Sequence, residues 1–251
     1  MVTGVDRFRD HFAGHEHQYV LIGGAACELI MDEVGLDFRA TKDLDIVLIA
    51  EALDSAFAER FWAFIEAGDY EVRERSEGDR ILYRFQKPKA EDFPAMLELF
   101  SRAPEGLSLA ADSRLTPLPI DEAAASLSAI LLDEAYYTFL KSMVRTAGGI
   151  PVLDEAAIIP FKARAWLDLS RQRDEGNKID EKNIRKHRND VARLLQLVSA
   201  SAQYVLPGPV ADDMRSFVEQ ATSEADFDPR QFKVSMSRED IAERLRAAYQ
   251  L

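Results

Sequence analysis

The segment Asp43–Ile49, with the sequence DLDIVLI, places two carboxylates inside a stretch that otherwise has the composition of a core strand. Side chains two residues apart in a strand point to the same side of the sheet, so Asp43 and Asp45 project together. Two like charges at this spacing are costly unless a proton or a cation offsets their repulsion. The segment therefore predicts a divalent cation held by oxygen ligands. The alternative is that the aspartates are exposed on an edge strand or at a strand entrance, where Asp43 merely caps a turn.

A strand, a glycine turn and a helix precede these aspartates. Tyr19–Ile22 is short and apolar and ends at Gly23 and Gly24, as is typical of a strand that enters a tight turn. Apolar side chains between Cys27 and Val34 then recur at helical spacing. Glycines at the start of a helix leave backbone N–H groups open to a phosphate, so the turn is a candidate phosphate site.

A third carboxylate stands in another predicted strand. Glu98 lies in the middle of Ala95–Phe100, with the sequence AMLELF, between two leucines. An acidic side chain in a segment expected to be buried calls for a partner. Three carboxylates on neighbouring strands would form an open oxygen site for one or two magnesium ions.

The other predicted elements divide the chain into two domains, 1–153 and 154–251. Residues 104–119 are rich in proline, serine and glycine and predict a loop, whereas residues 123–140 fit either a strand at 126–132 or a helix. The second domain is predicted to be helical, beginning at Asp154 as an N-cap. The further predicted elements are a helix at Ala52–Ala67, a hairpin of Tyr70–Arg75 with Arg80–Phe85, a strand at Ile150–Leu153, and helices at Asp154–Leu169, from about Glu181, and at Arg238–Tyr249.

Composition narrows the class of protein. The 251 residues are 47% hydrophobic, enough for a globular core, and no run of about 18 apolar residues predicts a membrane span. The first residues lack the layout of a secretion signal, so we expect a cytoplasmic protein without a membrane partner. The single cysteine, Cys27, excludes an intrachain disulfide and a cysteine-cluster metal site.

The net charge of −13 disfavours a broad nucleic-acid-binding surface, because phosphates would be repelled over most of the molecule. Lys and Arg nevertheless concentrate between Arg164 and Arg193. This stretch is either a local basic groove or a solvated helix surface, and the second interpretation is the simpler one.

Taken in order, these motifs resemble those of the DNA polymerase beta-type nucleotidyltransferase superfamily. The segment Arg39–Asp45, RATKDLD, is similar to the R-x-(S/T)-x-D-L-D motif of its AbiEii branch, the toxin component of type IV toxin-antitoxin pairs. That branch also has a lysine early in a later helix and a basic stretch ending in an aspartate, which Lys162 in IIPFKARAWLDL and Asp190 in KHRNDVARLL match. Ala25 departs from the superfamily, which commonly has serine or threonine after the glycines.

The resemblance implies an α+β nucleotidyltransferase fold, with a small mixed β-sheet flanked by helices and a mostly helical C-terminal region that supplies Lys162. Asp43, Asp45 and Glu98 would hold Mg²⁺, with Glu98 also helping to deprotonate the acceptor. The residues implied in phosphate binding are Gly23, Gly24 and Thr41. Lys162 would neutralise the triphosphate.

Two further residues keep alternative roles at this point. Arg39 would contact phosphate or acceptor, or else anchor its loop. Asp190 would face the lysine or the nucleotide, or else form a helix-surface pair with Lys186.

The implied activity is transfer of a nucleoside monophosphate from an NTP to an acceptor hydroxyl, with release of pyrophosphate. A toxin of this branch would modify an RNA end such as tRNA and would have a cognate antitoxin as its partner. A small-molecule acceptor fits the acidic composition at least as well, and a protein hydroxyl is a third candidate. The alternative from another class is a non-catalytic nucleotide-binding partner protein of the same fold.

Overall fold

The computed structural model describes residues 2–72, 83–103, 115–118 and 128–251. The chain divides into two compact units. The first comprises Met1–Tyr137 and Val144–Leu153, and the second comprises Thr138–Met143 and Asp154–Leu251.

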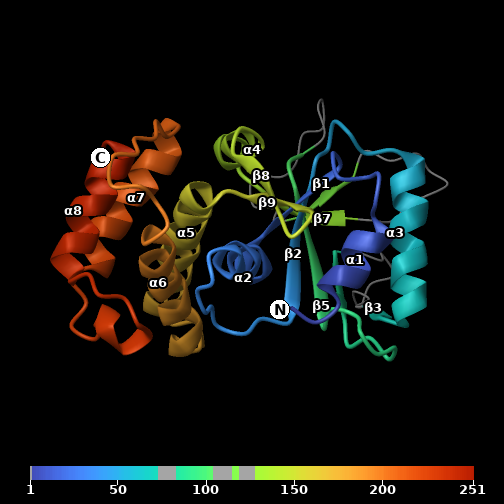
Figure 1. Cartoon of the computed structure of the whole chain (residues 1–251), viewed down its shortest axis with the longest axis horizontal. Coiled ribbons are helices and arrows are strands. Elements are labelled where there is room, and N and C mark those ends of the chain that lie inside the picture. Colours follow the sequence, from blue (N-terminus) through green and yellow to red (C-terminus); the bar gives the residue numbers. More distant parts are fainter. Residues whose placement is uncertain (1, 73–82, 104–114, 119–127) are drawn as a thin grey trace. The chain divides into compact units, whose positions relative to one another are not determined.

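The first unit is a mixed β-sheet flanked by helices, so the predicted α+β class is confirmed (Figure 1). Its strands are β1 (Tyr19–Ile22), β2 (Asp43–Leu48), β3 (Glu71–Val72), β4 (Arg84–Gln86), β5 (Met96–Ser101), β6 (Leu115–Pro117), β7 (Ser128–Leu131), β8 (Val144–Ala147) and β9 (Ile150–Leu153). Its helices are α1 (Val5–His11), α2 (Gly23–Glu33) and α3 (Ser55–Gly68), and α4 (Glu134–Lys141) runs across the boundary between the units.

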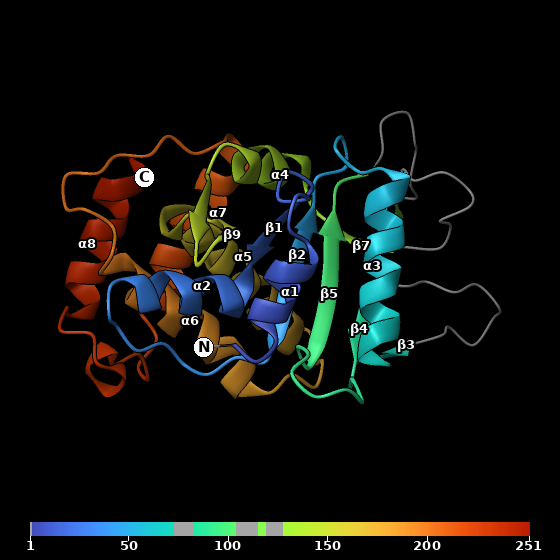
Figure 2. The same ribbon diagram turned by 45° about the vertical axis from the view of Figure 1, so that its right-hand side comes forward.

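The strand order is β3-β4-β5-β2-β1-β9-β8, with β7 joining at β5 and β6 pairing with β7. β2 is antiparallel to β1 and parallel to β5, so the strand with the two aspartates has a neighbour on each side. Figure 2 shows β5 between β2 and β4. Because β2 is an interior strand, the interpretation of its aspartates as edge-strand residues is wrong.

An aromatic cluster attaches α1 and α3 to one face of the sheet. Phe8 of α1 lies edge-on to Tyr19 of β1 and Phe64 of α3, with ring centroids 5.3 Å and 5.6 Å apart. Phe61 of α3 reaches Phe85 of β4 at 5.4 Å. Figure 1 shows α1 and α3 on this side of β2 and α2 on the other. Burial of these rings stabilises the layer, since large aromatic side chains remove much apolar area from water.

Several predicted elements of the first unit are confirmed with shifted ends, and others are corrected. The predicted hairpin forms β3 and β4, although its turn lies outside the described residues. The loop predicted at 104–119 contains a short strand, β6, and residues 104–114 lie outside the description. The strand predicted at 126–132 is confirmed as β7, and the alternative helix over 123–140 is wrong for this segment, because a helix, α4, begins only at Glu134.

The second unit is helical, as predicted from Asp154 onward. It contains α5 (Glu155–Asp174), α6 (Glu181–Leu195), α7 (Gly208–Ala221), a 3-10 turn η2 (Pro229–Phe232) and α8 (Arg238–Tyr249). Asp154 and Asp180 cap α5 and α6 by accepting bonds from backbone N–H groups in the first turn. Trp166 of α5 is buried with its ring edge-on to Phe217 of α7 at 5.5 Å, so it is a core residue.

A hydroxyl compensates for a proline inside α5. Pro160 has no N–H to donate to the carbonyl of Ala156 four residues earlier, which leaves that oxygen without its usual helical donor. The hydroxyl of Tyr249, from the end of α8, donates to the Ala156 carbonyl at 2.6 Å. The bond links the last helix to the proline turn of α5.

No helix among the described residues combines the length and the apolar character needed to cross a membrane.

Candidate functional site

The three predicted carboxylates lie on one face of the sheet. Asp45 of β2 is the register partner of Glu98 on the parallel strand β5, and Asp43 is the partner of Met96. Register partners on adjacent strands project to the same side, and Asp43 shares that side with Asp45 because the two are two residues apart. Both aspartates are half-buried. The sheet therefore brings together carboxylates that are more than fifty residues apart along the chain.

The glycine turn packs directly against Asp45. Gly23 follows β1 with a φ of +68°, and an added Cβ there would lie 1.8 Å from Oδ2 of Asp45. A side chain at this position would collide with the carboxylate, and the backbone conformation also disfavours any residue with a Cβ. Glycine is thus required at residue 23 by both the turn and the carboxylate.

The second glycine lies close to Thr41. A Cβ on Gly24 would lie 2.8 Å from Oγ1 of Thr41, the residue two positions before β2. Thr41 therefore places a hydroxyl at the turn, where Ala25 has none to offer. This arrangement brings Gly23, Gly24, Thr41 and Asp45 into one small region of the first unit.

The helix that starts at this turn lacks a side-chain cap. The N-cap residue of α2 is Ile22, which has no hydrogen-bond acceptor in its side chain, and no acidic residue lies in the first turn. By contrast, Asp54 caps α3 by accepting from the N–H of Phe57 at 2.8 Å. First-turn N–H groups need acceptors, and at an uncapped helix start these come from elsewhere, an anion among them.

Glu98 has a partner that sequence reasoning missed. Arg84 of β4 is its register partner on the other side of β5, and Nε of Arg84 donates to Oε1 of Glu98 at 2.6 Å. A second guanidinium nitrogen contacts the same oxygen. The Glu98 side chain is only 13% exposed. The pairing depends on the register of β4 against β5, for which the local sequence holds no signal.

Asp43, Asp45 and Glu98 are of the residue type that suits a hard divalent cation, because carboxylate oxygens are its usual ligands. They also lie on one face of two adjacent strands. Gly23 also leaves open the space beside Asp45 that a Cβ would fill. Within the described part of the chain, however, no group of three or more His, Cys, Asp or Glu side chains is arranged to hold a metal ion. The structure thus places Asp43 and Asp45 on one face of β2, whereas Glu98 is engaged by Arg84.

Arg39 lies in the connection between α2 and β2, with its guanidinium 5.4 Å from the centroid of the Phe38 ring. It is half-buried. This contact supports the interpretation of Arg39 as a residue that anchors its loop.

Lys162 and Asp190 meet in the second unit. Nζ of Lys162 on α5 donates to Oδ2 of Asp190 on α6 at 3.0 Å, and the two side chains are 5% and 0% exposed. Arg193 donates to the other oxygen of Asp190 at 3.2 Å. Asp190 therefore faces the predicted lysine, and because its side chain is fully buried it is not part of a helix-surface pair. That this lysine serves the same site as the carboxylates stays a prediction.

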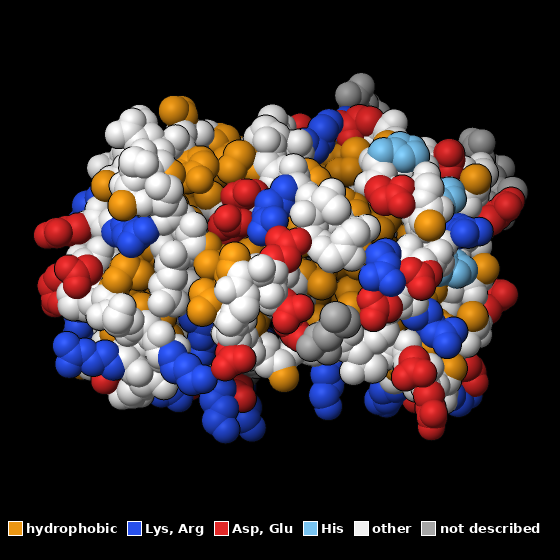
Figure 3. All heavy atoms as spheres, viewed as in Figure 1, with side chains coloured by type: hydrophobic (Ala, Val, Ile, Leu, Met, Phe, Trp, Pro, Cys, Tyr) orange, Lys and Arg blue, Asp and Glu red, His pale blue; other side chains and the backbone are white. Residues whose placement is uncertain are grey.

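Many Arg side chains in the basic stretch Arg164–Arg193 form ion pairs with carboxylates. Arg164 pairs with Asp213 at 2.6 Å, and Arg188, which is almost fully buried, pairs with Glu224 and with Asp226. Arg171, Arg173, Arg185 and Arg193 also form ion pairs. On the face drawn in Figure 3, acidic and basic side chains are interspersed. Apart from the buried Arg188, these pairings favour the interpretation of the stretch as a charge-balanced helix surface.

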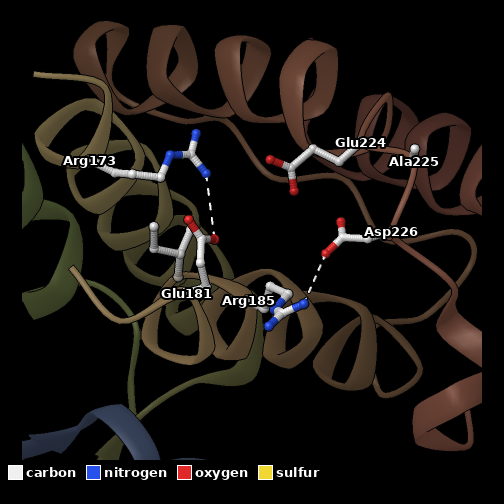
Figure 4. Close-up of a pocket in the computed structure, with 7 residues that line it drawn as sticks. Arg173, Glu181, Arg185, Glu224, Ala225 and Asp226 are labelled. Carbon is white, nitrogen blue, oxygen red and sulfur yellow. Dashed lines mark hydrogen bonds and ion pairs between the residues drawn. The ribbon is translucent and has the colours of Figure 1, made fainter. Parts of the chain in front are cut away.

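A pocket of about 320 Å³ opens in the second unit between α5, α6 and the connection that follows α7 (Figure 4). Its charged groups lie in pairs, with Arg173 3.7 Å from Glu181 and Arg185 3.4 Å from Asp226. Burial raises the pKa of Glu224, and a hydrogen bond from Arg188 lowers that of Asp226. None of the predicted site residues lines this pocket.

Comparison with known proteins does not place the chain in a family: no family model, no curated protein and no solved structure matches it.

Proposed function

We propose that the protein is a magnesium-dependent nucleotidyltransferase that moves a nucleoside monophosphate from an NTP to an acceptor hydroxyl. The observation that carries the proposal is the contact of Gly23 with Asp45, because it places a glycine turn at a helix N-terminus against a carboxylate in register with a second one. A phosphate site and a cation site that adjoin each other are what the substrate, a nucleotide bound with its metal ion, requires.

The triphosphate would bind at the start of α2. Backbone N–H groups of Gly23 and Gly24 have no side-chain cap at Ile22 and suit phosphate oxygens. Thr41 would donate its hydroxyl from beside Gly24, which compensates for the absence of a hydroxyl at Ala25. Arg39 would anchor the loop that carries Thr41, and it would also contact phosphate.

Asp43 and Asp45 would hold Mg²⁺, and Glu98 would join them once it leaves Arg84. When bound, the metal ion stabilises the charge that develops on the attacking and leaving oxygens. Glu98 would accept the proton of the acceptor hydroxyl, a role that requires a carboxylate within hydrogen-bond reach of that hydroxyl.

Lys162 would offset the negative charge that grows on the triphosphate as pyrophosphate leaves. Asp190, which also accepts from Arg193, holds the ammonium group of Lys162 in a fixed place, and a charge held in place acts without reorganisation. A nucleotidyltransferase fold is part of the proposal.

The first acceptor proposed is an RNA end such as that of tRNA, with the protein acting as a toxin beside a cognate antitoxin. The motif resemblance supports this choice. A small-molecule hydroxyl is the second candidate, and it is favoured by the net charge of −13 and by the ion pairing of the stretch Arg164–Arg193.

The test is incubation with each radiolabelled NTP, Mg²⁺ and total tRNA, beside the Asp45→Ala variant. Label on RNA with the unaltered protein alone would establish an RNA nucleotidyltransferase. NTP binding without label on RNA would direct the search to small-molecule acceptors. Equal labelling by Asp45→Ala would refute the assignment of the carboxylates, and absence of metal-dependent NTP binding would refute the proposed function itself.

A further inference from the structure

Four side chains form a row across the sheet at the level of the glycine turn. Ile22 of β1 is paired with Asp45 of β2, Asp45 with Glu98 of β5, and Glu98 with Arg84 of β4. Since register partners share a face, Asp45 and Arg84 approach Glu98 from its two neighbouring strands. Glu98 thus lies between a like charge and an opposite charge.

The ion pair in this row is well shielded from water. Two nitrogens of the Arg84 guanidinium contact a single oxygen of Glu98, one of them at 2.6 Å. The side chains of Arg84 and Glu98 are 33% and 13% exposed. Solvent therefore screens the pair less than it screens the ion pair between Lys87 and Glu71 at 2.9 Å, whose side chains are 70% and 52% exposed.

The guanidinium offsets the charge that a divalent cation would offset. Two carboxylates in register on adjacent strands repel each other, and a positive group beside either of them relieves the cost. Among the described residues Glu98 is not gathered with Asp43 and Asp45 into a group that could hold a metal, and its observed partner is Arg84. A cation that recruits Glu98 must displace this partner.

We propose that Arg84 is a positioning residue that competes with the divalent cation for the Glu98 carboxylate, so that Glu98 joins the metal site only when the cation displaces the guanidinium. This inference rests on the proposed function, because it takes the metal site of Asp43 and Asp45 as given. Arg84 thereby raises the cation concentration at which the site fills. When the site is empty, the guanidinium offsets the negative charge of Glu98 beside Asp45.

The experiment is a titration of the full-length protein with Mn²⁺ alone, followed by electron paramagnetic resonance of the free ion. Arg84→Gln should lower the dissociation constant for Mn²⁺ by about tenfold, equivalent to ~1.4 kcal/mol. Lys87→Gln is the matched control. It also removes one positive charge, but from the exposed ion pair with Glu71 just after β4, outside the row. This variant should bind Mn²⁺ as the unaltered protein does.

Glu98 supplies the internal check. Arg84→Gln should give no gain in Mn²⁺ affinity when it is added to Glu98→Gln, because the carboxylate for which Arg84 and the cation compete is then absent. If Arg84→Gln fails to fold, Arg84→Lys, which keeps a charge but loses the planar fork, should show the same direction of change with a smaller size. A dissociation constant unchanged or raised by both Arg84 variants would overturn the inference.

Asp45→Ala separates this inference from the function on which it rests. If Asp45→Ala binds Mn²⁺ as tightly as the unaltered protein does, the proposed metal site is wrong, and the role of Arg84 falls with it. If Asp45→Ala loses the cation while Arg84→Gln behaves like Lys87→Gln, the metal site stands and the role proposed for Arg84 alone is refuted.

Discussion

Gly23 and Asp45 are in such close contact that a single added carbon on the glycine would lie 1.8 Å from the carboxylate oxygen. The two residues come from the start of α2 and the middle of β2, and the antiparallel pairing of Ile22 with Asp45 brings them together. The contact joins the phosphate-binding motif to the carboxylate motif.

Gly23→Ala tests this contact against a matched glycine. Gly35 has nearly the same φ, +69° against +68°, but nothing lies within 4 Å of its added Cβ. We expect Gly35→Ala to lower the free energy of unfolding by about 1–2 kcal/mol through backbone strain alone. Gly23→Ala should cost a further ~1–3 kcal/mol from the clash with Asp45. Urea denaturation of both variants measures the difference, and equal losses would contradict the observed packing.

Asp45→Ala should fold normally and lose metal-dependent NTP binding. Removal of this carboxylate relieves its repulsion with Glu98, so the melting temperature should not fall by more than a few degrees. Calorimetric titration with NTP in the presence and absence of Mg²⁺ measures the binding. Undiminished binding would show that the aspartate has no part in holding the metal ion.

The buried pair of Lys162 and Asp190 predicts a strong asymmetry between single and double substitutions. Lys162→Met leaves the Asp190 carboxylate buried without the Lys162 charge beside it, and we expect the free energy of unfolding to fall by about 3–5 kcal/mol. In Lys162→Met/Asp190→Leu both buried charges are absent, and much of the loss should be recovered. Thermal denaturation of the variants checks this.

The double variant also separates structure from chemistry. If Lys162 acts on the triphosphate, Lys162→Met/Asp190→Leu should regain stability but remain without transfer activity. Recovery of both would assign the pair to folding alone.

Tyr249→Phe should destabilise the second unit by about 1–3 kcal/mol, because it removes the hydroxyl that donates to the Ala156 carbonyl and leaves a buried oxygen unpaired. Pro160→Ala restores the N–H that the helix lacks at this turn. The loss caused by Tyr249→Phe should therefore be smaller in a Pro160→Ala background, and a double-mutant cycle by urea denaturation measures the coupling.

Alkaline pH should weaken the fold. Burial raises the pKa of Tyr19, Tyr70 and Tyr249, and burial together with a bond to Glu51 raises that of Tyr137. The native state therefore keeps protons that the unfolded state releases above about pH 10, the ordinary pKa of tyrosine. Stability from these groups is complete below that pH and falls as the pH rises toward the native pKa values.

Free energies of unfolding measured from about pH 9 to about pH 11 test this dependence. The slope should be shallower in Tyr249→Phe, which has one titrating group fewer. A free energy that does not change across this interval would contradict the burial of these hydroxyls.

Local patterns in the sequence predicted the elements that carry the candidate site. The apolar run before Gly23, the helical spacing after Gly24 and the alternation around Asp45 correspond to β1, α2 and β2. Asp154 was likewise predicted and found as the N-cap of α5. These features are set by neighbours within a few residues, so periodicity and capping chemistry reveal them.

Weaker local signals left other elements unpredicted. The helix α1, the strand β8 and the helix α7 had no prediction; α1 and β8 are only seven and four residues long. Tertiary packing stabilises such elements, as the contacts of Phe8 in α1 with Tyr19 and Phe64 illustrate. Propensity alone does not determine them.

By itself, the sequence determined that two aspartates share one side of a core strand behind a glycine turn, because a strand alternates its side chains whatever surrounds it. Only the tertiary structure decided that Arg84 pairs with Glu98 and that Lys162 of α5 donates to the buried Asp190 of α6. Strand register and helix packing join residues far apart in the chain, and the pairing follows from how whole surfaces fit rather than from any short segment.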